Sequence, residues 1–153
     1  MKHSSLGKHS YVVIFVDDCT RFKVVKFAKK KSDTMATLVS LIADYITPQT
    51  LLIKCVMIDK GSKFKEETQS ELDRRSIMHE HTTSDMPQYN GVVECALGLL
   101  REKIIALMKE LDNVINVLRE KLWAHAMLFA CDVTNKSAMT SKDRSKSPYE
   151  LWF

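Results

Sequence analysis

The sequence predicts a single α/β domain built around a mixed β-sheet. Three stretches rich in β-branched and aromatic residues, "YVVIFVDD", "FKVVKFA" and "LLIKCVMID", are typical of strands. They are interspersed with and followed by segments in which apolar residues recur at helical spacing. With 153 residues, 45% of them hydrophobic and 27% charged, the chain is long enough for one core, and its few Gly and Pro argue against a disordered class.

The first half of the sequence predicts a hairpin, a helix and a buried strand. Strands over 11–18 and 22–28 are separated by three turn-like residues, so we expect them to pair antiparallel. Ser32 is the expected cap of a helix that runs through Tyr45, and Pro48 prevents its continuation. The expected inward residues of that helix are Met35, Leu38, Val39, Ile42 and Tyr45. The nearly continuous apolar run 51–59 predicts a strand buried on both faces, as in parallel sheets.

The second half predicts mainly helices. Residues 65–76 favour a helix with Leu72 inward, 77–81 a short strand, and 82–89 a loop. Two long amphipathic helices follow, from Gly91 to Leu111 and over 114–135. Their expected inward residues are Val92, Val93, Ala96, Leu99, Leu100, Ile104, Leu107, Met108 and Leu111, then Leu118, Leu122, Ala126, Phe129 and Val133. Pro148 suits the first turn of a last short helix.

The positive charge, +4 in total, is concentrated in two clusters. They comprise Arg21, Lys23, Lys26, Lys29, Lys30 and Lys31, and Lys136, Lys142, Arg144 and Lys146. Such clusters suit a polyanion such as nucleic acid, and a solvated lysine face explains them equally well. The four cysteines form no CxxC pair, and His79 and His81 have no third ligand nearby, so we expect no zinc. Without a membrane span or export signal, we expect an intracellular protein.

Two acids occupy positions that suit metal-dependent chemistry. Asp59 ends the predicted strand 51–59, and ligands of α/β sheets gather at the carboxyl ends of strands. Glu94 falls in the first turn of the helix that begins at Gly91. Phosphoryl transfer with divalent metal ions uses carboxylates that converge from distant sequence positions. A turn residue and an acid favoured by the helix dipole explain the same two positions without catalysis.

Four blocks in order resemble the integrase catalytic core of copia-type retrotransposons. They are "YVVIFVDDCTRFKVV", "MIDKGSKF", "MPQYNGVVE" and "SPYELWF", and together they cover almost the whole chain. The resemblance implies a ribonuclease H-like fold, a mixed sheet flanked by helices. It also implies an Asp, Asp, Glu site that uses Mg²⁺ or Mn²⁺ to process DNA 3′ ends and to join them to target DNA.

The resemblance assigns roles to particular residues. Asp59 corresponds to the second acid of the metal site and Glu94 to the third. The residues expected to approach DNA are Gln88, Asn90, Gly91, Lys60, Lys63 and Arg101. DNA is the implied partner, with a possible homo-oligomer and, for a functional protein, a nuclear location.

The departures from the family pattern concern the first acid and the basic residues after Glu94. The family's first Asp lies on a central strand upstream of the hairpin, whereas "MKHSSLGKHS" resembles the segment after that strand. We therefore expect 1–153 to be an N-terminally truncated core of marginal stability, unless N-terminal residues or a second molecule fill the gap. Asp17 and Asp18 match the hairpin turn, so we expect neither to bind metal.

Two hypotheses for the function follow. One is an integrase core, inactive as this isolated chain. The other is a non-enzymatic retrotransposon remnant that binds nucleic acid weakly or serves only as a structural domain. The second draws support from Cys95-Ala96-Leu97-Gly98, which replace a basic and polar stretch of the family.

Overall fold

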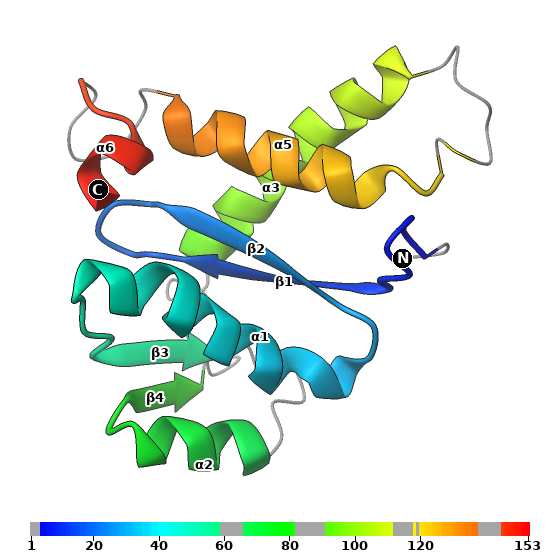
Figure 1. Cartoon of the computed structure of the whole chain (residues 1–153). Helices are drawn as coiled ribbons and strands as arrows, with labels where there is room; N and C mark the ends of the chain where they lie inside the picture. Colours follow the sequence, from blue (N-terminus) through cyan, green and yellow to red (C-terminus); the bar gives the residue numbers. More distant parts are fainter. Residues whose placement is uncertain (1–3, 59–65, 82–90, 112–117, 119, 138–144) are drawn as a thin grey trace. The chain divides into compact units, whose positions relative to one another are not determined.

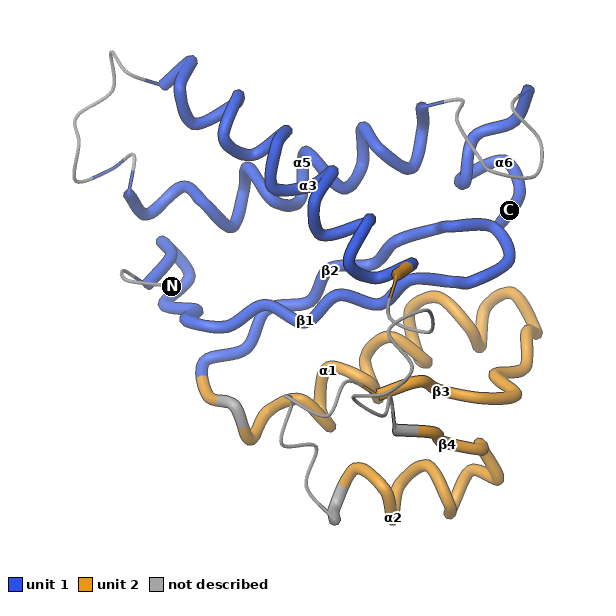
Figure 2. Tube along the Cα trace, turned by 180° about the vertical axis from the view of Figure 1, so that it is seen from behind, with its two compact units in different colours: residues 1–29, 92–153 blue, residues 30–91 orange. Residues whose placement is uncertain are grey.

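A computed structural model describes residues 4–58, 66–81, 91–111, 118, 120–137 and 145–153 (Figure 1). The chain divides into two compact units, 1–29 with 92–153 and 30–91 (Figure 2). One contains an antiparallel strand pair and the other a parallel pair, each accompanied by helices. The expected α/β class with mixed strand directions is confirmed.

The first unit is built on the predicted hairpin. Strands β1 (Tyr11–Val16) and β2 (Lys23–Ala28) pair antiparallel along their whole length, with Tyr11 opposite Ala28. Helices α3 (Gly91–Glu110) and α5 (Trp123–Lys136) pack against β2. The buried cluster that joins these elements consists of Val25, Leu100, Met127, Ala130 and Cys131. The hairpin and the long helix from Gly91 are therefore confirmed.

The chain ends in helix α6 (Pro148–Trp152), as the position of Pro148 predicts. The Ser147 hydroxyl accepts a hydrogen bond from the Glu150 amide at 3.2 Å, and the Glu150 carboxylate accepts one from the Ser147 amide at 2.7 Å. This reciprocal capping box fixes the first turn. The Trp152 ring stacks on Phe22 with 5.0 Å between ring centroids, which holds α6 against the end of the hairpin.

The second unit consists of helical turns around the parallel pair β3 (Cys55–Ile58) and β4 (Met78–His81). A 3₁₀ turn (Lys31–Asp33) leads into α1 (Thr34–Leu41), and α2 (Glu66–Arg74) precedes β4. Among the described residues of this unit, the buried apolar ones are Leu38, Leu41, Ile42, Ile46, Ile58, Leu72 and Ile77. The parallel arrangement, the strand at 77–81 and the inward position of Leu72 are as predicted.

The beginning and the end of the helical segment differ from the prediction. Ser32 does not cap α1; the Asp33 carboxylate instead accepts a hydrogen bond from the Lys30 amide at 2.9 Å. Helical turns continue beyond Tyr45 as a π turn (Ile42–Ile46) and a 3₁₀ turn (Thr47–Gln49). Because Pro48 has no N–H, the helix widens so that Thr47 donates to the Ile42 carbonyl, and Thr50, in the left-handed conformation, ends the segment.

The prediction that 51–59 is a strand buried on both faces is wrong for the described residues. The strand is only Cys55–Ile58, and within it Ile58 alone is buried. Leu52 is 88% exposed. In the described part of the chain β3 has a single neighbouring strand, β4, so it lacks the second strand neighbour of a central strand.

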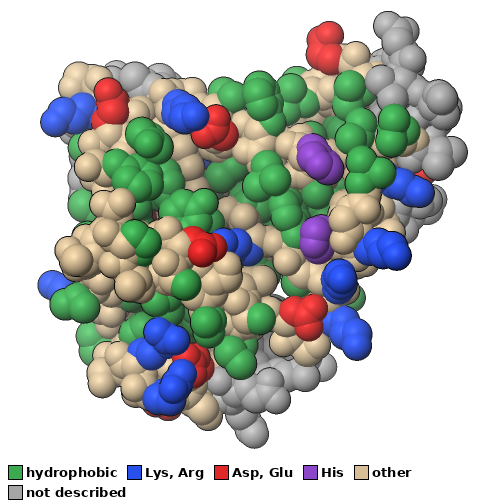
Figure 3. Space-filling model, in the orientation of Figure 1, with side chains coloured by type: hydrophobic (Ala, Val, Ile, Leu, Met, Phe, Trp, Pro, Cys, Tyr) green, Lys and Arg blue, Asp and Glu red, His purple; other side chains and the backbone are tan. Residues whose placement is uncertain are grey.

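Some apolar residues of the long helices face outward instead of inward. Leu99 is 45% exposed, Phe129 is 57% exposed and Leu118 is 43% exposed, contrary to the prediction. Figure 3 shows that hydrophobic side chains are exposed at several places on the visible face. Among the helices that the structure describes, none has the length and apolar character needed to span a bilayer.

Candidate functional site

Glu94 lies at the N-terminal end of α3, on the side of the helix away from the core. Ala96 and Leu100 point into the unit and are 3% and 1% exposed. At about 100° per residue, Glu94 lies roughly opposite to them, and it is exposed. A carboxylate in the first helical turn is stabilised by the positive end of the helix dipole. The fold therefore presents this side chain on the outer face of the helix.

Arg101 extends the same outward face. It follows Glu94 by about two turns, roughly 10 Å along the axis, and is exposed. Between them lies Gly98, where an added Cβ would meet nothing within 4 Å, and the same holds for Gly91 at the start of the helix. The structure thus places three of the predicted site residues, Gly91, Glu94 and Arg101, on one helix, with an open strip of backbone between the acid and the base.

The other predicted site residues lie outside the described part of the chain. They are Asp59, Lys60, Lys63, Gln88 and Asn90. Within the described ranges, no group of three or more His, Cys, Asp or Glu side chains is close enough to hold a metal ion. Glu94 and Arg101 are therefore the predicted site side chains that the structure shows.

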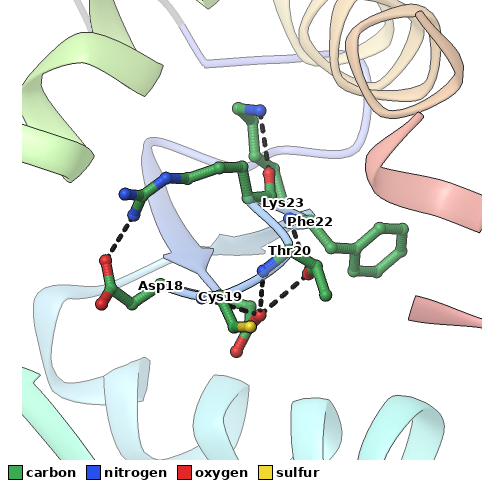
Figure 4. Close-up of polar contacts among 7 residues, drawn as sticks. Asp18, Cys19, Thr20, Phe22 and Lys23 are labelled. Atoms are coloured by element: carbon green, nitrogen blue, oxygen red, sulfur yellow. Dashed lines mark hydrogen bonds and ion pairs between the residues drawn. The ribbon is translucent and has the colours of Figure 1, made fainter. Parts of the chain in front are cut away.

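Asp17 and Asp18 stabilise the hairpin turn, as predicted. Figure 4 shows the turn, with Asp18, Cys19 and Thr20 labelled. One oxygen of Asp17 accepts hydrogen bonds from the amides of Cys19 and Thr20, at 3.1 and 2.7 Å, and from the Thr20 hydroxyl at 2.8 Å. Asp18 forms an ion pair with Arg21, whose backbone is left-handed. Acids that bind their own turn in this way explain the "VDDCTR" stretch without a metal.

Lys23 is buried, which contradicts its assignment to a basic cluster. The residue is 6% exposed and its ammonium group donates to the Arg21 carbonyl at 2.9 Å. Burial lowers the pKa of this amine, the nearby Cys131 and Cys95 thiols oppose the shift, and Arg21 adds to it. Charge counting alone could not reveal this burial, because a buried lysine and a surface lysine look alike in a sequence.

Other members of the basic clusters are engaged in ion pairs. Arg21 pairs with Asp18, and Lys136 pairs with Asp132 at 2.9 Å. Lys29, Lys30 and Lys146 are exposed, whereas Lys142 and Arg144 lie outside the described residues. The positive surface that the structure shows is consequently smaller than the sequence clusters predict.

Comparisons with known proteins identify the fold and the relatives. No family model matches the chain. The chain is 26% identical over 138 residues, 90% of its length, to the retrovirus-related Pol polyprotein from transposon TNT 1-94 of Nicotiana tabacum. The match covers 10% of that protein, so the chain spans about a tenth of the length of this curated relative.

Solved structures of viral integrases share the fold. A chain of the simian T-cell lymphotropic virus intasome in complex with PP2A regulatory subunit B56 gamma matches 92% of this chain and 47% of its own length, with a TM-score of 0.70 and 18% identity. The HTLV-2 integrase catalytic core domain in complex with magnesium matches 93% of this chain and 84% of its own length. Its TM-score is 0.65 and its sequence identity is 15%.

The catalytic core domain of BIV integrase matches equally well. It covers 92% of this chain and 84% of its own length, with a TM-score of 0.65 and 17% identity. At these low sequence identities the solved structures show the fold alone. The similarity in sequence comes from the match to the transposon polyprotein. The chain is similar in sequence to a retrotransposon Pol polyprotein, and its fold is the one found in integrase catalytic cores, the ribonuclease H-like fold.

Proposed function

We propose that this domain is an integrase-type core in which Glu94 is a carboxylate ligand of a divalent-cation site, with Asp59 as a second ligand. The reaction of such a site is DNA 3′-end processing followed by strand transfer. The observation that carries the proposal is the outward position of Glu94 on the first turn of α3, in a fold shared with a core that was solved in complex with magnesium.

The donor set suits Mg²⁺ or Mn²⁺. Both are hard cations that prefer carboxylate oxygens, which is what Glu94 and Asp59 offer. When bound, such an ion activates a water or hydroxyl nucleophile and stabilises the leaving oxygen. The contribution of Glu94 is to hold a carboxylate ligand at a fixed place on the helix, near the positive end of the helix dipole. Neutralising the side chain removes this contribution and leaves the helix intact.

We also propose that DNA binds to the outward side of α3, which carries Glu94 and Arg101. Arg101 lies on the Glu94 side of α3, and an exposed guanidinium group is well suited to a phosphate. The other residues proposed to contact DNA are Lys60, Lys63, Gln88, Asn90 and Gly91. Assembly of several copies on DNA and a nuclear location belong to the same proposal.

We propose that the isolated chain is catalytically silent and binds nucleic acid weakly, as the non-enzymatic alternative holds. The observations that favour this are local to the first unit. Lys23 is buried, Arg21 and Lys136 are in ion pairs, and Gly98 provides no side chain beside Glu94. Each free phosphate-binding cation that is lost weakens binding and makes its salt dependence shallower.

A metal-binding measurement tests the role of Glu94. We expect Mn²⁺ to broaden the NMR signals of the first-turn amides of α3, and Glu94→Gln to abolish this broadening. Glu102→Gln, an exposed acid on the same helix, is the matched control and should leave the broadening unchanged. Equal broadening in wild type and Glu94→Gln would remove Glu94 from the proposed site.

A strand-transfer assay tests whether the chain is silent. With Mg²⁺ or Mn²⁺ and a DNA end substrate, we expect no product above background from the wild-type chain. Product that disappears in Glu94→Gln and persists in Glu102→Gln would overturn the silent state and would support the catalytic function directly.

A further inference from the structure

The β3–β4 pair has one buried face and one exposed face. Along each strand the side chains alternate, so Val56 and Ile58 share one face of β3 while Cys55 and Met57 share the other. Ile58 is 1% exposed and belongs to the core, whereas Met57 is 46% exposed. The burial of the strand therefore identifies the face that bears Cys55 and Met57 as the outer one.

The register of the pair completes this outer face. Cys55 lies beside Met78, and Met57 lies beside Glu80. Met78 is 66% exposed, and both Cys55 and Glu80 are exposed. Paired strands are about 4.8 Å apart and alternate residues of one strand about 7 Å apart, so the four side chains stand at the corners of a rectangle. A point above its centre is roughly 4 Å from each corner in projection.

The four groups differ chemically from an ordinary exposed sheet surface. Methionine normally fills gaps in a core, whereas Met57 and Met78 are exposed and lie on the same face as the exposed Cys55. Partial desolvation, together with the charge of Glu80, raises the pKa of the Cys55 thiol. The thiol and the carboxylate are thus close enough to interact across the diagonal of the rectangle.

We propose that Cys55, Met57 and Met78 form a binding site for a soft monovalent cation, Cu⁺ or Ag⁺, with Glu80 at its edge. A thiolate and two thioethers are the ligands that such cations prefer, while a single carboxylate is a poor set for Mg²⁺ or Ca²⁺. Binding replaces the thiol proton by the metal, so one proton is released for each ion bound, and no oxidant or reductant is needed. The Glu80 carboxylate then faces a bound cation instead of a neutral thiol.

The test uses the full chain in reduced form with Cys19 and Cys95, the other exposed cysteines, replaced by serine. Cu⁺ is delivered anaerobically from a competing chromogenic chelator, and Ag⁺ serves as the redox-inert probe. We expect one ion per chain in this background and affinity that falls as the pH is lowered. Cys55→Ser should abolish binding, and Met57→Leu and Met78→Leu should each weaken it by on the order of tenfold.

Matched variants separate the site from other effects. Met108→Leu, a half-buried methionine on α3, should leave the affinity unchanged. Leucine is close to methionine in size and both target residues are exposed, so far-ultraviolet circular dichroism should be the same for all the variants. Unchanged affinity in the Met57→Leu/Met78→Leu double variant would overturn the proposal, because it would show that a thiol alone binds the ion. The Mn²⁺ test at Glu94 and this Cu⁺ test use different residues and different ions, so either proposal can fail without the other.

Discussion

The side-chain amide of Asn135 binds both backbone polar groups of Lys23. Its Oδ1 accepts a hydrogen bond from the Lys23 amide at 2.9 Å, and its Nδ2 donates to the Lys23 carbonyl at 2.7 Å. The Cys131 thiol donates to the same carbonyl at 3.3 Å. Because both Lys23 and Asn135 are buried, this contact fixes α5 against the start of β2 without help from water.

Replacing this amide should destabilise the domain strongly. Asn135→Ala removes the buried hydrogen-bond partner of the Lys23 N–H and one of the two donors to the Lys23 carbonyl. We therefore expect the free energy of unfolding to fall by about 2–3 kcal/mol. Urea denaturation followed by circular dichroism measures the change. Lys136→Ala, which removes an exposed ion pair one residue later, should cost only about 0–1 kcal/mol. Similar losses in the two variants would contradict the anchoring role.

The buried Lys23 amine should make stability depend on alkaline pH. Its pKa is lowered from 10.5 in the folded state, so between that lowered value and 10.5 the unfolded chain binds more protons. Stability therefore rises with pH across this window, and the cost of burying the charge is fully present below it. Lys23→Met should be more stable at neutral pH and should lose the rise. The comparison is made in a Cys131→Ala background, because the Cys131 thiol titrates in the same pH range. A rise in stability that persists in Lys23→Met would show that Lys23 is not its cause.

The buried Cys131 thiol should be protected from modification. Burial raises its pKa to about 11 from 9.0, whereas Cys19, Cys55 and Cys95 are exposed. We expect a thiol reagent to label three cysteines in the folded chain and the fourth only in denaturant. The same shift contributes stability of up to about 3 kcal/mol below pH 9, which is lost as the pH rises through 11. Rapid native labelling of Cys131, read by peptide mass spectrometry, would contradict the burial.

The elements that were predicted correctly have strong local signals. The hairpin follows from two β-branched runs with a turn between them, and Asp17 indeed binds that turn. The start of α3 was predicted from the helical period, whereas the outward position of Glu94 comes from the structure, in which Ala96 and Leu100 are buried on the other side. For the candidate site, the sequence pattern predicted the helix that carries Glu94. The role of Glu94 as a metal ligand was inferred from the resemblance to integrases.

The errors arise where tertiary packing decides between two equally apolar choices. In α5 the consecutive Met127, Leu128 and Phe129 allow more than one inward stripe. The structure buries Met127 with the small Ala130 and Cys131, which let the helix approach Val25 of β2, and this leaves Phe129 at the surface. Lys23 is a similar case, because it is buried at a point where its backbone binds Asn135, more than a hundred residues away.

The edge of β1 that does not face β2 should mediate self-association. In the described part of the chain β1 has β2 as its one strand neighbour, and its sequence, YVVIFV, carries no charge. Such an edge can pair with another strand, so we expect sedimentation velocity to show association that grows with concentration. Val13→Glu places a charge opposite Lys26 and should reduce association, while Val12 and Ile14 continue to pack on the core. Val13→Thr, uncharged and β-branched, is the control and should associate like wild type. A wild-type chain that stays monomeric and unfolds cooperatively at high temperature would contradict both the open edge and the expected marginal stability.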